Sequence, residues 1–259
     1  MTFMIEKYFL LFFILSVVGW CMEVACKFVQ FRRFINRGFL IGPYCPIYGI
    51  GSVLITLLLS RFSADPIIVF LMAMIVCGTL EYITSYAMEK LFHARWWDYS
   101  SKRFNIDGRV CANTLIPFGL LGLLLIYAIK PFLFSLFDRI TPKFMHALCA
   151  VLFILMLSDA VISATILGKI RKSATQTSGI DDTESLTRSV REHLSKHGRL
   201  VRRALRAFPY MKLYNSEVLR SMRMRQQRIK REAEERSHRL REDFEIFERK
   251  LRERNSKNK

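Results

Sequence analysis

Acidic side chains stand inside long apolar segments of this chain. They are Glu23, Glu81, Glu89 and Asp159. A carboxylate near the centre of a bilayer costs about 2.5–3.5 kcal/mol on insertion scales, so such groups seldom face lipid. Glu81, Ser85 and Glu89 follow one another at four-residue spacing, which places them on one face of a helix. We therefore expect these acids to be paired or to line a pocket.

Two connections supply the cations and amides that such acids could meet. One is the stretch NRGFLIGPYCPIYG (36–49), and the other is ARWWDYSSKRFNIDGRVCAN (94–113). An acid in a medium of low dielectric constant must be neutralised or paired, and arginine is a suitable partner. The candidate ligand-binding pocket consists of Glu23, Asn36, Arg37, Glu81, Glu89, Arg95, Asp98, Asn105, Arg109 and Asn113. The alternative is that these ion pairs only hold the connections against the helices.

Two kinds of chemistry would suit this set of residues. Carboxylates such as Glu81 and Asp98 could hold a divalent cation through oxygen ligands, and arginines such as Arg103 and Arg109 could grip a phosphate group. The sequence has neither an H-E-x-x-H nor a G-x-S-x-G motif. We therefore assign no catalytic residue, metal or cofactor, and whether the chain is an enzyme stays open.

The elements that carry these residues have the length and composition of membrane spans. Crossing ~30 Å of hydrocarbon as a helix takes about 20 apolar residues. The candidate spans are Thr2–Phe28, Tyr48–Phe62, Pro66–Leu91, Asn113–Phe137 and Phe144–Gly168. The second is the shortest. The predicted fold class is all-α, a polytopic transmembrane bundle of about five spans.

The distribution of positive charge predicts the orientation in the cell membrane. Twelve Lys and Arg residues lie in or beside the connections that follow the first, third and fifth spans, against five at the other ends. Cytoplasmic loops carry the excess of such residues. We therefore expect the N-terminus outside and the C-terminal tail in the cytoplasm, with the connections 36–49 and 94–113 on the cytoplasmic side.

The connection 36–49 is too apolar for a free linker and too interrupted for a helix. Pro43 and Pro46 would remove hydrogen bonds from a helix interior. Non-helical backbone at membrane depth survives only where protein or water satisfies it. We expect a re-entrant or interfacial loop packed against the bundle; the alternative is a plain turn into the second span.

The C-terminal part differs in composition from the rest. Residues 1–168 form the expected transmembrane domain, 169–185 read as a linker, and 186–259 as a basic helical tail. Of the 40 Lys and Arg residues, 26 lie from Lys169 onward, with 13 acids. Leu186, Val190, Leu194, Val201 and Leu205 recur at helical spacing. Anionic lipid or an acidic partner is expected for the tail; nucleic acid is disfavoured because no nucleic-acid-binding motif is present.

Several strings of the chain occur together in order in one known family. These strings are GWCMEV (19–24), NRGFLIGPYCPIYGIG (36–51), MEKLF (88–92), RWWDYS (95–100) and FNIDGRVC (104–111). With Glu81 between them, residues 5–170 resemble the bacterial integral membrane family labelled putative ABC-transporter permease, type IV. The resemblance implies a membrane component that works with a separate ATPase, and the chain itself contains no G-x-x-x-x-G-K-[ST] loop for ATP. Five spans are few for a permease, so a homodimer is expected.

Three functions follow from these observations. The first is a permease-like subunit of unknown substrate with a polar site at the cytoplasmic mouth. The second is a membrane enzyme that acts on a lipid-linked or phosphate-bearing substrate. The third is a membrane scaffold or sensor whose basic tail recruits a partner.

Overall fold

A computed structural model describes residues 2–32, 34, 36, 38, 40–177, 183–195, 199–207 and 211–215, together with single positions between 218 and 236. The helices are α1 (Thr2–Phe31), α2 (Pro46–Leu59), η1 (Ser60–Phe62), α3 (Pro66–Phe92), α4 (Ala112–Leu124), the π-helical turn η2 (Leu125–Ile129), α5 (Lys130–Phe137), α6 (Pro142–Gln176), α7 (Thr183–Ser195) and α8 (Arg199–Ala207). Four two-residue strands complete the described elements: β1 (Ala94–Arg95), β2 (Asn105–Ile106), β3 (Val110–Cys111) and β4 (Lys212–Leu213).

Within the described residues, four helices are long and apolar enough to cross a membrane. They span Phe3–Gln30, Pro66–Phe92, Ala112–Phe137 and Pro142–Gln176. The helix Pro46–Phe62 is equally apolar but shorter. The chain is therefore a mostly helical, multi-pass membrane protein. Large apolar side chains of α6 such as Phe153, Ile154 and Leu155 are more than half exposed, and their exposure to lipid would carry no cost.

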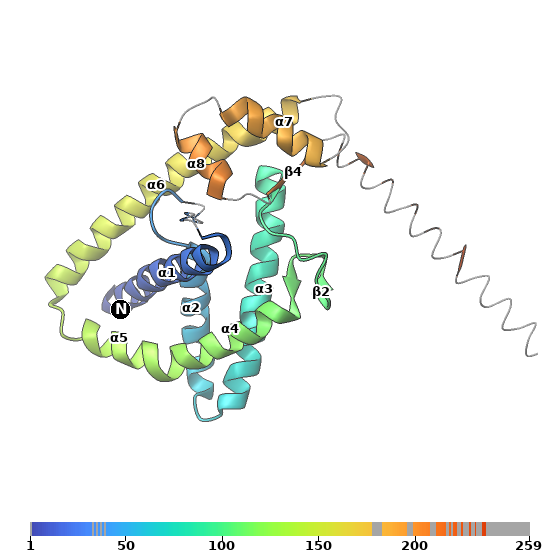
Figure 1. Cartoon of the computed structure of the whole chain (residues 1–259). Helices are drawn as coiled ribbons and strands as arrows, with labels where there is room; N and C mark the ends of the chain where they lie inside the picture. The colour runs from blue at the N-terminus through green and yellow to red at the C-terminus, as the bar shows by residue number, and fades with distance from the viewer. Residues whose placement is uncertain are drawn as a thin grey trace, which may run out of the picture.

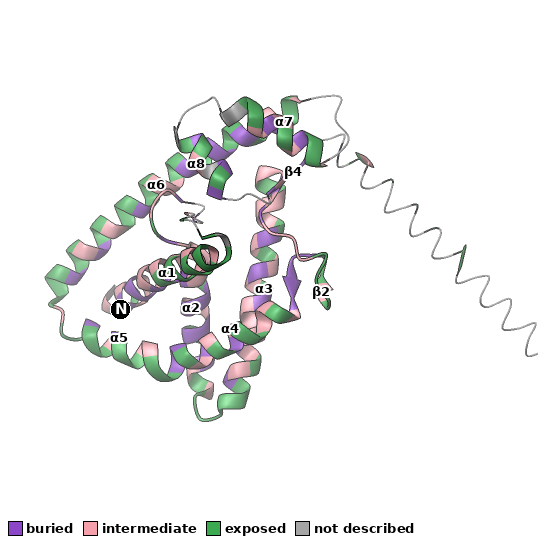
Figure 2. Cartoon of the chain, viewed as in Figure 1, coloured by how far each residue is buried: buried purple, intermediate pink, exposed green. Residues whose placement is uncertain are grey.

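The long helices form an open frame (Figure 1). α4 and α5 run along its lower edge, α6 rises from there on the left to α7, and α3 stands on the right with α1 and α2 between them. Exposed residues are frequent along α4, α5 and α6, whereas the short α2 is largely buried or half-buried (Figure 2). One buried cluster joins Leu11 of α1, Leu59 of α2, Val69 of α3, Phe137 of α5 and Met145 of α6.

Local chemistry sets where α3 begins and how closely it packs. Asp65 is its N-cap and accepts hydrogen bonds from the amides of Ile67 and Ile68 at 2.9 and 3.2 Å. Along the α3–α4 contact, a Cβ built on Gly122 would lie 2.3 Å from the Cβ of Ala73. Glycine is therefore needed there for the two helices to approach.

The described part of the connection 36–49 packs against the middle of α1 and α6. The amide of Cys45 donates to the carbonyl of Ser16 at 2.8 Å. Asp159 of α6 accepts hydrogen bonds from the amides of Ile41 and Gly42 at 2.8 and 2.7 Å. The described part of the connection therefore lies against the bundle, as expected of a packed loop.

The C-terminal part packs onto the ends of α3 and α6. Leu186, Val190, Val201 and Leu205 of α7 and α8 join a buried cluster with Ile170 of α6. The helical spacing of these four residues thus marked a buried face; the side chain of Leu194 lies outside the described residues.

Two details of the C-terminal part differ from the sequence expectation. α6 continues to Gln176, so the first eight residues of the expected linker are helical. After Pro209 the expected helix is preceded by strand β4, which pairs antiparallel with β1. The rest of that expected helix lies largely outside the described residues.

Candidate functional site

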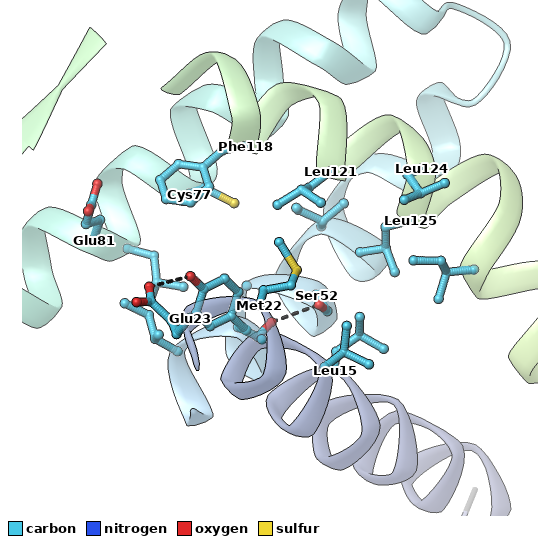
Figure 3. A pocket seen from close by; sticks show the side chains of 18 of the residues that line it. Leu15, Met22, Glu23, Ser52, Cys77, Glu81, Phe118, Leu121, Leu124 and Leu125 are labelled. Carbon is cyan, nitrogen blue, oxygen red and sulfur yellow. Dashed lines mark hydrogen bonds between the residues drawn. The ribbon is translucent and has the colours of Figure 1, made fainter. Parts of the chain in front are cut away.

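A cavity of about 250 Å³ lies among α1, α2, α3 and α4 (Figure 3). Most of its wall is apolar: Leu15, Val18, Met22, Ile47, Ile55, Leu80, Phe118, Leu121, Leu124, Leu125 and Ile129. The carboxyl groups of Glu23 and Glu81 lie at one end of the cavity, and leucines line the other end. The cavity is thus amphipathic along its length.

Hydroxyl groups bind both carboxylates at the polar end. The hydroxyl of Tyr48 donates to Glu23 Oε1 at 2.9 Å. Glu81 accepts from the hydroxyl of Tyr99 at 3.2 Å and from Thr114 at 3.3 Å. Burial raises the pKa of Tyr99, and the neighbouring Glu81 carboxylate raises it further. Tyr99 therefore remains a hydrogen-bond donor across the physiological range.

A close approach of α2 to α1 puts Tyr48 in reach of Glu23. A Cβ built on Gly19 would lie 2.3 Å from Cγ of Tyr48. Any larger residue at Gly19 would displace the ring, and the hydroxyl would lose the carboxylate one helical turn farther along α1. Gly19 therefore leaves room for the Tyr48 ring, and Glu23 accepts the hydrogen bond from its hydroxyl.

A larger vestibule of about 1000 Å³ adjoins the cavity. The two spaces share Met22, Glu23, Tyr48, Trp97 and Tyr99. The outer wall of the vestibule comes from α7 and from the segment beside β4, with residues of both charges: Glu184, Arg188, Arg191, Glu192 and Lys212. The cavity therefore opens toward the C-terminal part of the chain.

A second polar cluster lies at the end of α3. Glu89 accepts a hydrogen bond from Arg109 Nη1 at 2.7 Å and pairs with Arg95 Nη2 at 3.1 Å. Arg95 also lies 3.7 Å from Asp98. Tyr82 and Tyr86 stack beneath the Arg109 guanidinium, 5.6 and 5.5 Å from it. The cluster fixes the connection 94–113 on α3.

Asp98 links this connection to β4. It accepts hydrogen bonds from Lys212 Nζ at 2.5 Å and from the Ser100 hydroxyl at 2.5 Å. Partial burial opposes ionisation of Asp98, but the hydrogen bonds from Lys212 and Ser100 prevail and lower its pKa to about 2. Asp98 is thus a charged anchor for the C-terminal part.

The structure places the residues of the predicted pocket in two groups rather than one. Glu23 and Glu81 face the cavity, whereas Glu89, Arg95, Asp98 and Arg109 form the separate cluster at the end of α3. Among the described residues, the expected single cluster thus corresponds to two groups, and Asp98 of the second group also lines the vestibule that Glu23 lines. The two groups share α3 and the connection 94–113.

The three predicted amides take other positions. Asn36 accepts a hydrogen bond from the Trp20 indole at 2.8 Å and holds the connection to α1. Asn105 shapes a turn: it donates to the carbonyl of Lys102 at 2.7 Å and accepts from the amide of Gly108 at 2.9 Å. Asn113 is exposed, and its neighbour Thr114 contacts Glu81 instead. Arg37 lies outside the described residues.

Sequence reasoning missed the hydroxyl partners of the acids. Tyr48, Tyr99 and Thr114 carry no signal of their own, because hydroxyl residues suit both apolar and polar surroundings. Trp97 lines both spaces and donates to the carbonyl of Arg109 at 3.0 Å. Among the described residues, no group of three or more His, Cys, Asp or Glu side chains could hold a metal ion.

Comparison with known proteins bears on the transmembrane part. No curated protein matches the chain, and no solved structure does. A family model described as putative ABC-transporter type IV matches residues 10–164, which run from α1 into α6. The match includes Glu23, Glu81 and both connections, and it covers more than half of the sequence. The chain therefore belongs to the putative ABC-transporter type IV family.

Proposed function

We propose that this chain is the membrane subunit of a transporter and that the cavity among α1, α2, α3 and α4 is its substrate site. The observation that carries the proposal is the continuity of two spaces. An apolar cavity with Glu23 and Glu81 at one end adjoins a wide polar vestibule through shared walls. A substrate with an apolar and a polar part would fit across this junction.

The contacts at the two ends of the frame support five crossings, with the short α2 as one of them. At one end, Lys7 of α1 pairs with Asp138 after α5, and Tyr127 donates to the carbonyl of Ser63 at 2.9 Å. At the other end, Arg203 of α8 donates to the carbonyl of Leu40 at 2.6 Å. With the positive-inside rule, the second end is cytoplasmic and the N-terminus is outside.

A separate ATPase would supply the energy, and a second copy of the chain would complete the translocation path. The family supports this assignment, and the chain itself lacks a phosphate-binding loop. An enzyme that grips phosphate fits less well, because Arg95 and Arg109 already bind Glu89. A purely structural scaffold would not account for a cavity that opens to a vestibule.

A cavity-filling variant tests the transporter function. A Cβ on Gly51 would lie 3.5 Å from Leu80 and 3.9 Å from Cys77, both of which line the cavity. Gly51→Leu therefore extends into the cavity. Gly168→Leu is the matched control, because a Cβ there meets nothing within 4 Å.

The measurement uses the full chain, purified with its partners from the cells that make it. We expect an ATP-hydrolysing subunit to co-purify with wild type and both variants, and its hydrolysis rate to change at least about threefold in Gly51→Leu only. Unchanged thermal unfolding of Gly51→Leu confirms that it folds. Absence of an ATPase, or equal rates in all three proteins, contradicts the proposal.

A further inference from the structure

We propose that the cavity selects an amphipathic cation: an ammonium group that carries an aromatic or aliphatic body. The inference rests on the proposed function only in taking this cavity as the substrate site. It adds the chemical class of the substrate, which neither the family nor the fold assigns.

The first argument is the charge of the wall. The described residues that line the cavity include Glu23 and Glu81 but no Lys, Arg or His. Negative charge on these two side chains makes the polar end of the cavity a more favourable place for a cation than for an anion.

The second argument is the contrast between two acids on one helix face. Glu89 is bound by Arg95 and Arg109, both supplied by the connection 94–113. Two turns earlier, Glu81 is 7% exposed and has hydroxyl partners at 3.2 and 3.3 Å. Within the described part of the chain, no cation pairs with Glu81. The fold thus neutralises one acid internally and leaves the other facing the cavity.

The third argument is the aromatic character of the polar end. Tyr48, Trp97, Tyr99 and Phe118 all line the cavity. The faces of such rings attract ammonium groups, and tryptophan attracts them most strongly. Carboxylates combined with aromatic faces form the environment that recognises quaternary ammonium ligands. The leucines at the other end of the cavity then receive the apolar body of the ligand.

The vestibule does not set this preference. Its wall mixes Lys27, Arg188 and Lys212 with Asp98 and Glu184. Ligands of either charge can therefore reach the mouth of the cavity. Selection takes place only where the wall carries acids alone.

Two probes of similar size and opposite charge test the proposal. They are benzyltrimethylammonium and phenylmethanesulfonate, and both are soluble in water. Their binding is measured by equilibrium dialysis against the full chain in lipid nanodiscs, with empty nanodiscs subtracted. The variants are Glu81→Gln, which keeps the shape of the side chain, and Gly51→Leu, which fills the cavity.

Asp65→Asn is the matched control for loss of an acid. Asp65 caps the opposite end of α3, and asparagine caps helices equally well. We expect wild type and Asp65→Asn to bind the ammonium probe alike, and Glu81→Gln and Gly51→Leu to bind it at least about tenfold more weakly. The sulfonate probe should not bind above the nanodisc background.

Three results would overturn the assignment: no binding of the ammonium probe, equal or tighter binding of the sulfonate probe, or unchanged ammonium binding by Glu81→Gln. The last would mean that Glu81 is already neutralised by a proton. Ammonium binding by a chain with no ATPase partner would leave the ligand class standing and remove only the transporter function. ATPase coupling without ammonium binding would leave the transporter function standing and remove only the ligand class.

Discussion

At the scale of single residues, the same side chain takes different roles according to what the neighbouring connection supplies. Glu81 and Glu89 are eight residues apart on α3. Glu89 meets two guanidinium groups, and Glu81 meets two hydroxyls. Burial is tolerated in both cases because each oxygen of Glu81 accepts from a hydroxyl, and Oε2 of Glu89 accepts from both arginines.

Removal of the Glu89 charge should destabilise the protein. Glu89→Gln leaves Arg109 buried without its counter-ion and leaves Arg95 with only Asp98 at 3.7 Å. Loss of hydrogen bonds to a charged group costs about 2 kcal/mol. We expect a lower Tm in detergent by several degrees. Glu184→Gln, on the exposed side of α7, is the control and should leave the Tm unchanged. Equal melting of Glu89→Gln and wild type would show that the cluster contributes little.

Asp98 should make attachment of the C-terminal part sensitive to acid. Its pKa of about 2 lies below the value near ~3.9 of an unfolded chain, so its contribution is complete above about pH 4 and is lost as the pH falls toward 2. Pepsin cleavage within α7 and α8 should therefore accelerate over this range in wild type. In Asp98→Asn, cleavage should be faster at pH 4 and should change less between pH 4 and 2.

Sequence reasoning at this scale found the acids and the arginine partners of Glu89, but not the hydroxyl partners of Glu23 and Glu81. A carboxylate in an apolar segment is rare enough to be noticed, which is how Glu23, Glu81 and Glu89 were identified. Which group approaches each acid depends on the packing of distant segments. Thr114 reaches Glu81 across 33 residues, and no local pattern of the sequence contains that information.

At the scale of elements, one carboxylate accepts the backbone hydrogen bonds that a helix or a strand would otherwise satisfy. The segment around Ile41 and Gly42 has no helical or strand partner, yet both amides donate to Asp159, as does the Tyr44 hydroxyl at 2.6 Å. Buried backbone groups must find acceptors. Asp159 supplies two of them from the middle of α6, which explains an acid at that depth without any ligand.

Loss of the Asp159 charge should loosen this segment specifically. In Asp159→Asn the side chain has a single neutral oxygen for two amides and two hydroxyls. We expect hydrogen exchange at Ile41 and Gly42 to accelerate at least about tenfold. Ser163→Ala, which removes only a donor on α6 itself, is the comparison and should exchange as wild type. Equal exchange in all three proteins would mean that other contacts hold the segment.

Hydropathy predicted the long helices well and the short strands not at all. Continuous apolar runs mark α1, α3, α4–α5 and α6, because only a helix satisfies their backbone in lipid. β1 and β4 are two residues each and pair across more than 100 positions of sequence. No period can be read from two residues, and β4 follows α7 and α8 in the chain, so its pairing depends on where those helices pack.

At the scale of the whole molecule, the C-terminal part joins both connections of the membrane part. Arg203 binds the carbonyls of Leu40 and Ile41, and Lys212 binds Asp98. Both contacts come from segments outside the family match, which ends at residue 164. The vestibule, whose wall includes residues of α7 and β4, therefore belongs to a unit larger than the membrane domain alone.

The proposed orientation can be tested by labelling from one side. In a variant with all native cysteines replaced by alanine, Ser63→Cys lies between η1 and α3, and Ser101→Cys lies in the connection 94–113; both positions are exposed. A membrane-impermeant maleimide should label position 63 in intact cells and position 101 only after permeabilisation. The opposite pattern would invert the topology, and labelling of both in intact cells would remove α3 as a span.

α6 runs without interruption from Pro142 to Gln176. Its last turns carry Ile170 and Ala174 into the cluster formed with α7 and α8. A helix of this length reaches ~52 Å, so a 10° pivot about one end would displace the other by about 9 Å. A small tilt of α6 within the bilayer would thus produce a large displacement at its far end. α6 could transmit such a movement between the membrane helices and α7 and α8.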